Sequence, residues 1–240
     1  MSAARRRHLR DYGLAWSPLN HPLPILDRLG GRLESNGRTK VCIYGCGHGS
    51  IYAPLQDPAW QVWGINTVPP LDAQRRIRAD LWWDLHTRCA QSDDDLEWMR
   101  QLPVPIFVPD DLLDLGPHTV RFPLEAVLQV GPGPFACTFA YQIAYALLVG
   151  VREVGLFGID LAYGDRRERT VEWASVNWWM GYAVARGMIF HLPPGSRLGQ
   201  HPYRYGFDYQ CEIDDTKDYV AMMRQFDESD EARKRRSVGG

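Results

Sequence analysis

Several common sequence signals are missing or weak in this chain of 240 residues. No CxxC pair occurs, so neither a thiolate zinc site nor a disulfide framework is indicated, and we expect reduced thiols. No apolar run approaches the roughly 20 residues that span a bilayer. Residues 1–10 are basic but lack the apolar stretch of a secretory signal, so we expect a cytoplasmic protein without membrane contact. The formal net charge of −2 gives no attraction of the whole chain to nucleic acid. Five cysteines are scattered along the chain: Cys42, Cys46, Cys89, Cys137 and Cys211.

What is present indicates a folded α/β protein. Apolar residues make up 45% of the chain and aromatic residues 12%, which is enough for a substantial core. Short apolar runs alternate with segments of helical spacing, and this alternation is typical of a mostly parallel, doubly wound, Rossmann-like sheet. The expected strands are 41–44, 62–66, 81–86, 105–108, 119–122, 153–160 and 188–192, and the expected helices are 96–102, 136–149 and 171–186.

The pattern predicts one domain with two appendages. Residues 1–38 are polar and rich in arginine, and we expect an arm followed by a short lead-in helix over 24–33. Residues 39–198 form the expected Rossmann-like nucleotide-binding domain. Residues 199–240 hold an aromatic loop and then a charged C-terminal helix over 215–235.

Polar residues recur at the carboxyl ends of the expected strands, where open parallel sheets bind their ligands. The first such group is the turn Gly45, Cys46, Gly47, His48, Gly49 and Ser50. Glycines there let backbone N–H groups approach an anion, aided by the dipole of a following helix, and His48 is well placed for a phosphate or as a general acid. The turn lacks the third glycine of G-x-G-x-x-G and the Lys-Ser/Thr of a P-loop. It is equally compatible with S-adenosylmethionine binding, or with a tight turn that binds nothing.

The other strand ends supply one amide and several titratable groups. Asn66 stands where a dinucleotide or S-adenosylmethionine site usually has an acidic residue, so it is either a ligand contact or a loop cap. Asp84 and His86 are two residues apart, and they could act as base and orienter, hold a divalent metal, or form a structural pair. Asp160 follows an apolar strand and is either functional or a loop cap, and Tyr163 could stack on a base or sugar.

Two segments carry a family resemblance. The segments 135–141 and 153–163, joined by an alanine-rich helix, resemble the Rossmann-like domain of the motility-associated factor (Maf) flagellin glycosyltransferases. The opening 41–50, with Trp63-Gly-Ile-Asn66, is similar to the G-x-G-P-S…N arrangement of that family and of some bacterial sialyltransferases, with His48-Gly49 in place of Pro-Ser. Archaeal 6-hydroxymethylpterin pyrophosphokinases look like more distant relatives. Residues 41–198 also resemble small bacteriophage proteins.

The resemblance implies a nucleotide-activated sugar as donor, often a CMP-activated nonulosonic acid in the relatives. By this resemblance Gly45, Gly47, Ser50 and Asn66 would contact the nucleotide. Thr138 and Asp160 would line the donor or acceptor side.

Four functions remain open from the sequence. The first is a glycosyltransferase, with Asp84, His86 or Asp160 deprotonating an acceptor hydroxyl on a glycan, a protein or, in a phage-encoded enzyme of the host cytoplasm, a modified DNA base. The second is a non-catalytic phage protein that binds or sequesters a nucleotide. The third is an S-adenosylmethionine-dependent methyltransferase. The fourth is a diphosphotransferase, which would need more carboxylates for Mg²⁺ than the pattern supplies.

Two further features concern partners. Short basic clusters at 5–7 and 75–78 would suit a polyanion, although both are more often solvated surface. The tryptophans of 173–179 would suit either the core or a contact between two copies of the chain.

Overall fold

The computed structural model describes residues 40–66, 79–159, 161 and 168–199. The arm, the lead-in helix, the basic cluster at 75–78, the aromatic loop and the C-terminal helix therefore lie outside the described residues. The strands are β1 Lys40–Tyr44, β2 Trp60–Trp63, β3 Trp82–Trp83, β4 Ile106–Val108, β5 Thr119–Arg121, β6 Glu153–Phe157 and β7 Ile189–His191. The α-helices are α3 Asp93–Gln101, α4 Leu124–Leu128, α5 Thr138–Leu148 and α6 Trp173–Val184.

All described strand pairs are parallel, as the sequence pattern predicts. The strands form two groups, in the orders β2-β1-β6-β7 and β3-β4-β5. A parallel bridge between Trp63 and Leu81 joins the groups, and the amide of Gly64 donates to the carbonyl of Leu81 at 3.0 Å. The strand order is therefore β5-β4-β3-β2-β1-β6-β7, a doubly wound arrangement in which the direction of winding reverses between β1 and β6.

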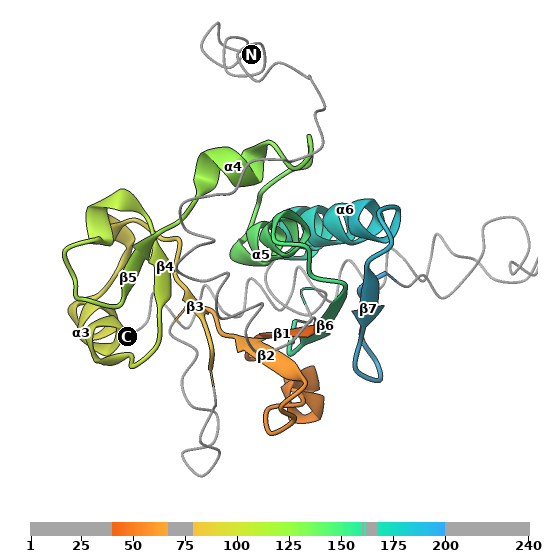
Figure 1. Cartoon of the computed structure of the whole chain (residues 1–240), viewed down its shortest axis with the longest axis horizontal. Helices are drawn as coiled ribbons and strands as arrows, with labels where there is room; N and C mark the ends of the chain where they lie inside the picture. Colours follow the sequence, from red (N-terminus) through yellow and green to blue (C-terminus); the bar gives the residue numbers. More distant parts are fainter. Residues whose placement is uncertain (1–39, 67–78, 160, 162–167, 200–240) are drawn as a thin grey trace, which may run out of the picture.

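Alternating side chains of the strands feed two cores on opposite faces of the sheet. Val41 and Ile43 face the larger core, which α5 and α6 cover, whereas Cys42 and Tyr44 face a smaller core shared with α3. Figure 1 shows α5 and α6 lying next to each other, with α3 near β4 and β5. Because these neighbouring strands are parallel, the carboxyl ends of β1, β2, β3 and β6 lie at one edge of the sheet.

Local sequence explains where the helices begin and end. Ser92 caps α3 through a capping box with Asp95, and three aspartates lie in its first turn, where the helix dipole favours negative charge. Gly150 after α5 and Gly187 after α6 have φ values of 76° and 84°, which suit glycine at a helix C-terminus. The helix expected over 171–186 is present as α6, preceded by a π-helical turn, Glu168–Glu172.

Candidate functional site

The loops after β1 and β6 meet at the point where the winding reverses. The amide of Gly45 donates to the carbonyl of Phe157 at 2.8 Å, and the amide of Gly47 donates to the carbonyl of Gly158 at 2.8 Å. These two N–H groups hold the loops together, so they are not directed at an anion as the glycine pattern predicts. The glycine turn is thus first a junction between two strand ends.

Close packing explains two of the glycines at this junction. A Cβ on Gly45 would lie 2.5 Å from the carbonyl oxygen of Gly158, and a Cβ on Gly158 would lie 2.3 Å from that of Gly45. Gly158 also has a φ of 71°, which disfavours other residues. Neither position tolerates a side chain without moving the backbone.

The turn continues into a short 3₁₀-helix, His48–Tyr52, and not into a longer α-helix. The helix dipole expected behind the glycines is therefore not provided by this segment. Ser50 and Gly49 are buried in it, and the side chain of His48 lies outside the described part.

Asn66 is clamped at the end of β2 in a rare backbone conformation. Its φ is 48°, its amide donates to the carbonyl of Trp83 at 2.8 Å, and its carbonyl accepts from Nε1 of Trp82 at 2.8 Å. Gly64 makes room for this arrangement, because a Cβ there would lie 2.2 Å from the Trp82 ring. The side-chain Oδ1 of Asn66 is buried and has no hydrogen-bond partner among the described residues. A left-handed residue that is held on both sides and has an unsatisfied side-chain oxygen is a candidate ligand contact.

Asp84 and His86 form a pair just beyond β3, which ends at Trp83 and not at residue 86 as the sequence predicts. The Asp84 side chain is only 2% exposed, and its Oδ1 lies 2.9 Å from Nδ1 of His86. The same oxygen accepts from the His86 amide at 3.1 Å and from Nε2 of Gln91 at 2.9 Å. The His86 side chain is 52% exposed. A neutral ring that donates from Nδ1 to this carboxylate has its lone pair on Nε2, the state a general base requires.

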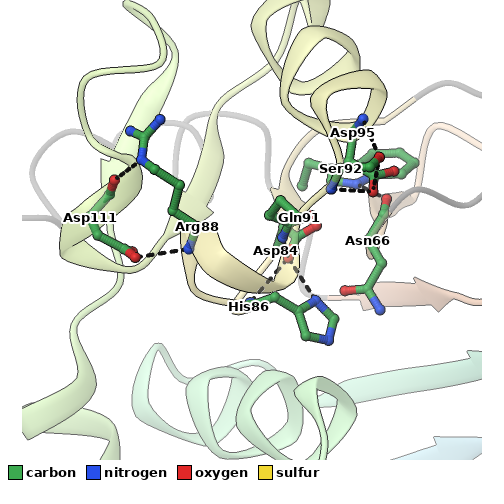
Figure 2. Close-up of polar contacts among 9 residues, drawn as sticks. Asn66, Asp84, His86, Arg88, Gln91, Ser92, Asp95 and Asp111 are labelled. Atoms are coloured by element: carbon green, nitrogen blue, oxygen red, sulfur yellow. Dashed lines mark hydrogen bonds and ion pairs between the residues drawn. The ribbon is translucent and has the colours of Figure 1, made fainter.

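The loop that carries Gln91 is anchored on both sides. The Arg88 amide donates to Oδ2 of Asp111 at 2.8 Å, and Arg88 Nε donates to the Asp111 carbonyl at 2.9 Å. On the other side the capping box of Ser92 and Asp95 begins α3. Figure 2 shows these anchors around Asp84, with the His86 ring and the Asn66 amide pointing the same way from neighbouring strand ends. The geometry of the Asp84–His86 pair is therefore fixed from several directions.

Helix α5 begins at this same edge of the sheet. Phe139 in its first turn packs against both cores, which places it at an end of the sheet. Nε2 of Gln142 donates to the carbonyl of Gly64, just beyond β2, at 3.4 Å, so that end is the carboxyl end. Thr138 is the first residue of α5 and is buried, and the side chain of Cys137 before it makes no capping hydrogen bond. The positive end of this eleven-residue helix therefore faces the carboxyl edge of the sheet. The sequence predicts that a helix directly after the glycine turn has this role.

Gln142 is a polar residue that the sequence interpretation did not consider. It is completely buried, and with Nε2 turned to Gly64 its Oε1 has no hydrogen-bond partner in the described part. An unsatisfied buried acceptor costs about 1–3 kcal/mol. The signal in the sequence is a lone glutamine inside an apolar helix. Gln91, also missed, carries no such signal because it lies in a polar loop.

Two sequence candidates lie outside the described residues, and His191 at the end of β7 belongs to a separate cluster. Asp160 and Tyr163 are outside them, so their places are not stated. Nε2 of His191 lies 2.8 Å from Oε2 of Glu153, and Nζ of Lys40 lies 2.9 Å from the same oxygen. Hydrogen bonds from Lys40, and then from His191, lower the pKa of Glu153. His191 is therefore part of an ion-pair cluster.

The tryptophans of α6 divide between core and surface. Trp179 is completely buried, and its Nε1 donates to the carbonyl of Pro134 at 2.8 Å. Trp178 is 37% exposed and stacks on Tyr182. The core interpretation of the tryptophan segment is thus confirmed for Trp179.

The described residues contain neither a metal-binding cluster nor a membrane-spanning helix. No group of three or more His, Cys, Asp or Glu side chains there is arranged to hold a metal ion. None of the helices described is both long and apolar enough to cross a membrane.

No protein-family model matches the chain, and no curated protein or solved structure shows significant similarity to it. The function is therefore inferred from the geometry of the site alone.

Proposed function

We propose that the protein is a transferase that uses a nucleotide-activated donor, most concretely a glycosyltransferase. The observation that carries the proposal is the pair formed by a buried Asp84 carboxylate and a half-exposed His86 ring at the carboxyl edge of the sheet. A histidine whose tautomer is fixed by a buried carboxylate can take the proton of a hydroxyl group and so activate that hydroxyl for nucleophilic attack. A module that only sequesters a nucleotide has no need of such a pair.

The spacing of the strands suits a ligand with two ends. β1 and β3 are separated by one strand, so their carboxyl ends lie about 10 Å apart. The nucleoside would lie beside Asn66 and the phosphate near Thr138 and the N-terminus of α5. The transferred group, which is bonded to that phosphate, would extend from there toward His86. The positive end of α5 favours the negative charge that develops on the leaving phosphate.

The proposed reaction is a displacement at the carbon that bears the phosphate. Nε2 of His86 takes the proton of an acceptor hydroxyl, and the acceptor oxygen forms its bond to that carbon. The bond between the carbon and the phosphate oxygen breaks, and the nucleotide leaves with the electron pair. Asp84 stabilises the imidazolium that results.

A ligand screen tests the proposal. Thermal unfolding is followed with CMP, UDP, GDP, ATP and S-adenosylmethionine, each with and without Mg²⁺, because a bound ligand raises the midpoint by mass action. We expect a shift with at least one nucleotide and release of that nucleotide from its sugar conjugate. A shift with S-adenosylmethionine alone would overturn the proposal in favour of a methyltransferase. Binding of a nucleotide sugar without hydrolysis or transfer would favour sequestration.

A further inference from the structure

Two unsatisfied amide oxygens lie at the carboxyl end of β2. Oδ1 of Asn66 and Oε1 of Gln142 are both buried and have no hydrogen-bond partner in the described part of the chain. Gln142 is tied to the same strand end, because its Nε2 donates to the carbonyl of Gly64 at 3.4 Å. Asn66 follows Gly64 by two residues.

The direction of the Gln142 amide is set by chemistry. Only the NH₂ group of the side chain can donate to the Gly64 carbonyl, so the oxygen must be turned away from it. The backbone of Asn66 is held by Trp82 and Trp83 on the neighbouring strand. The oxygen of Gln142 is therefore directed away from Gly64, and the Asn66 side chain extends from a backbone that is held in place. In Figure 2 the Asn66 amide points toward the helix drawn below it in pale green.

We propose that Asn66 and Gln142 form an acceptor pair that reads hydrogen-bond donors on the nucleoside part of the ligand. This inference rests on the proposed function and names what the site selects within it. Two acceptors favour a group with two donors and reject a group that presents another acceptor, because two facing acceptors would both remain unpaired. On a nucleotide such donors are either the amino group of the base or the two hydroxyls of the ribose. Gln142 is then a specificity-determining residue inside a helix that otherwise serves the core.

A binding experiment on the wild-type chain separates the two sources of donors. Titration calorimetry is carried out with the pairs CMP and UMP, AMP and IMP, and CMP and 2′-deoxy-CMP. In the first two pairs an amino group is replaced by a carbonyl, and in the third a sugar hydroxyl is removed. If the base supplies the donors, the amino nucleotide binds about tenfold or more tightly than its partner. If the ribose supplies them, the ribonucleotide is preferred by a similar factor.

A variant with a matched control locates the effect. Gln142→Met removes the acceptor at similar volume, and we expect the discrimination between the paired nucleotides to fall to about twofold or less. The stability of the unliganded variant should change little, because the removal of the unsatisfied acceptor offsets the loss of the hydrogen bond to the Gly64 carbonyl. The control is Gln61→Met, since Gln61 is also buried but its Oε1 already accepts from Trp63 Nε1 at 3.1 Å. This control should lose stability and keep the discrimination.

The outcomes separate this inference from the proposed function. If nucleotides bind without any preference within the pairs, the acceptor pair is wrong and the proposed function stands. Suppose that the wild type prefers one nucleotide of a pair and that both Gln142→Met and Gln142→Leu keep this preference. In that case the buried oxygen of Gln142 binds an internal water, and the inference is overturned. If no nucleotide binds, both fail.

Discussion

Nδ1 of His86 lies 2.9 Å from Oδ1 of Asp84, and the two side chains differ sharply in exposure, 52% against 2%. The buried carboxylate also accepts from Gln91, so it is held in place independently of the histidine. This relationship distinguishes the pair from the ion pair of His191 and Glu153, in which the carboxylate is 23% exposed.

The first prediction concerns the carboxylate. Asp84→Asn keeps the shape of the side chain but lets an amide NH₂ face the ring, so His86 loses its preferred tautomer. We expect the turnover of a donor to fall by about 10²- to 10⁴-fold with little change in nucleotide affinity. Steady-state release of nucleotide measures this. Asp93→Asn, at an exposed position in α3, serves as the control and should match the wild type. Equal turnover in both variants would remove Asp84 from the reaction.

The sequence predicts the individual strands and helices better than it predicts the contacts between them. The strands and helices are predicted well, because β1, β6 and α5 are marked by apolar runs and by glycine at the helix end. The polar edge is also predicted, since Asp84 directly follows β3 and Asn66 comes three residues after the end of β2. The sequence does not say which strands are neighbours, so the contact between the Gly45 and Gly158 loops could not be foreseen.

The glycine turn therefore has a different role from the one its sequence predicts. The glycine pattern predicts that the amides of the turn face an anion, whereas the amide of Gly45 donates to Phe157, the last residue of β6, and the amide of Gly47 donates to Gly158 just beyond it. The helix that faces the edge is α5, which is distant in sequence from the turn. Gln142 was missed because its meaning lies in an unsatisfied atom, which only the packed structure reveals.

The second prediction concerns the junction of the two loops. Gly45→Ala would place a Cβ 2.5 Å from a backbone oxygen that cannot move without disturbing β6. We expect the free energy of unfolding to fall by about 2–3 kcal/mol, measured by urea denaturation. Gly116→Ala is the control, because a Cβ there meets nothing within 4 Å, and its stability should be unchanged or slightly raised. A Gly45→Ala protein as stable as the control would contradict the close approach.

The third prediction concerns pH. Hydrogen bonds from Lys40 and then His191 lower the pKa of Glu153 below its ordinary value of 4.5, so the folded state favours the ionised carboxylate. A lowered pKa stabilises the fold above the ordinary value, and that stability is lost as the pH falls through the lowered pKa. The stability difference between the wild type and Glu153→Gln should therefore be fully present above the ordinary value of 4.5 and shrink as the pH falls through the lowered pKa. Thermal unfolding across this range measures it, and a difference that does not change with pH would be the contrary result.

The fourth prediction uses the cysteines as reporters of the site. Cys46 is exposed in the glycine turn, whereas Cys42 is buried in β1 and burial raises the pKa of its thiol to about 12. A thiol reagent should modify Cys46 in the native protein and Cys42 only after unfolding. A saturating nucleotide should slow the modification of Cys46, because the proposed phosphate site lies at the same edge.

Peptide mass spectrometry resolves the two positions, and Cys42 remains the internal control. If the ligand binds but leaves the rate at Cys46 unchanged, the ligand does not lie against the glycine turn.

The central claim is that His86, oriented by Asp84, acts as the base on a nucleotide-activated donor held at this edge. The most direct test is the release of nucleotide from a panel of nucleotide-activated sugars by the wild type and by His86→Ala, with His191→Ala as the control. The account predicts that at least one donor is consumed by the wild type and by His191→Ala, and that His86→Ala is at least about 100-fold slower although it still binds the nucleotide. Equal turnover by His86→Ala, or a panel in which no donor is bound or consumed, would contradict it.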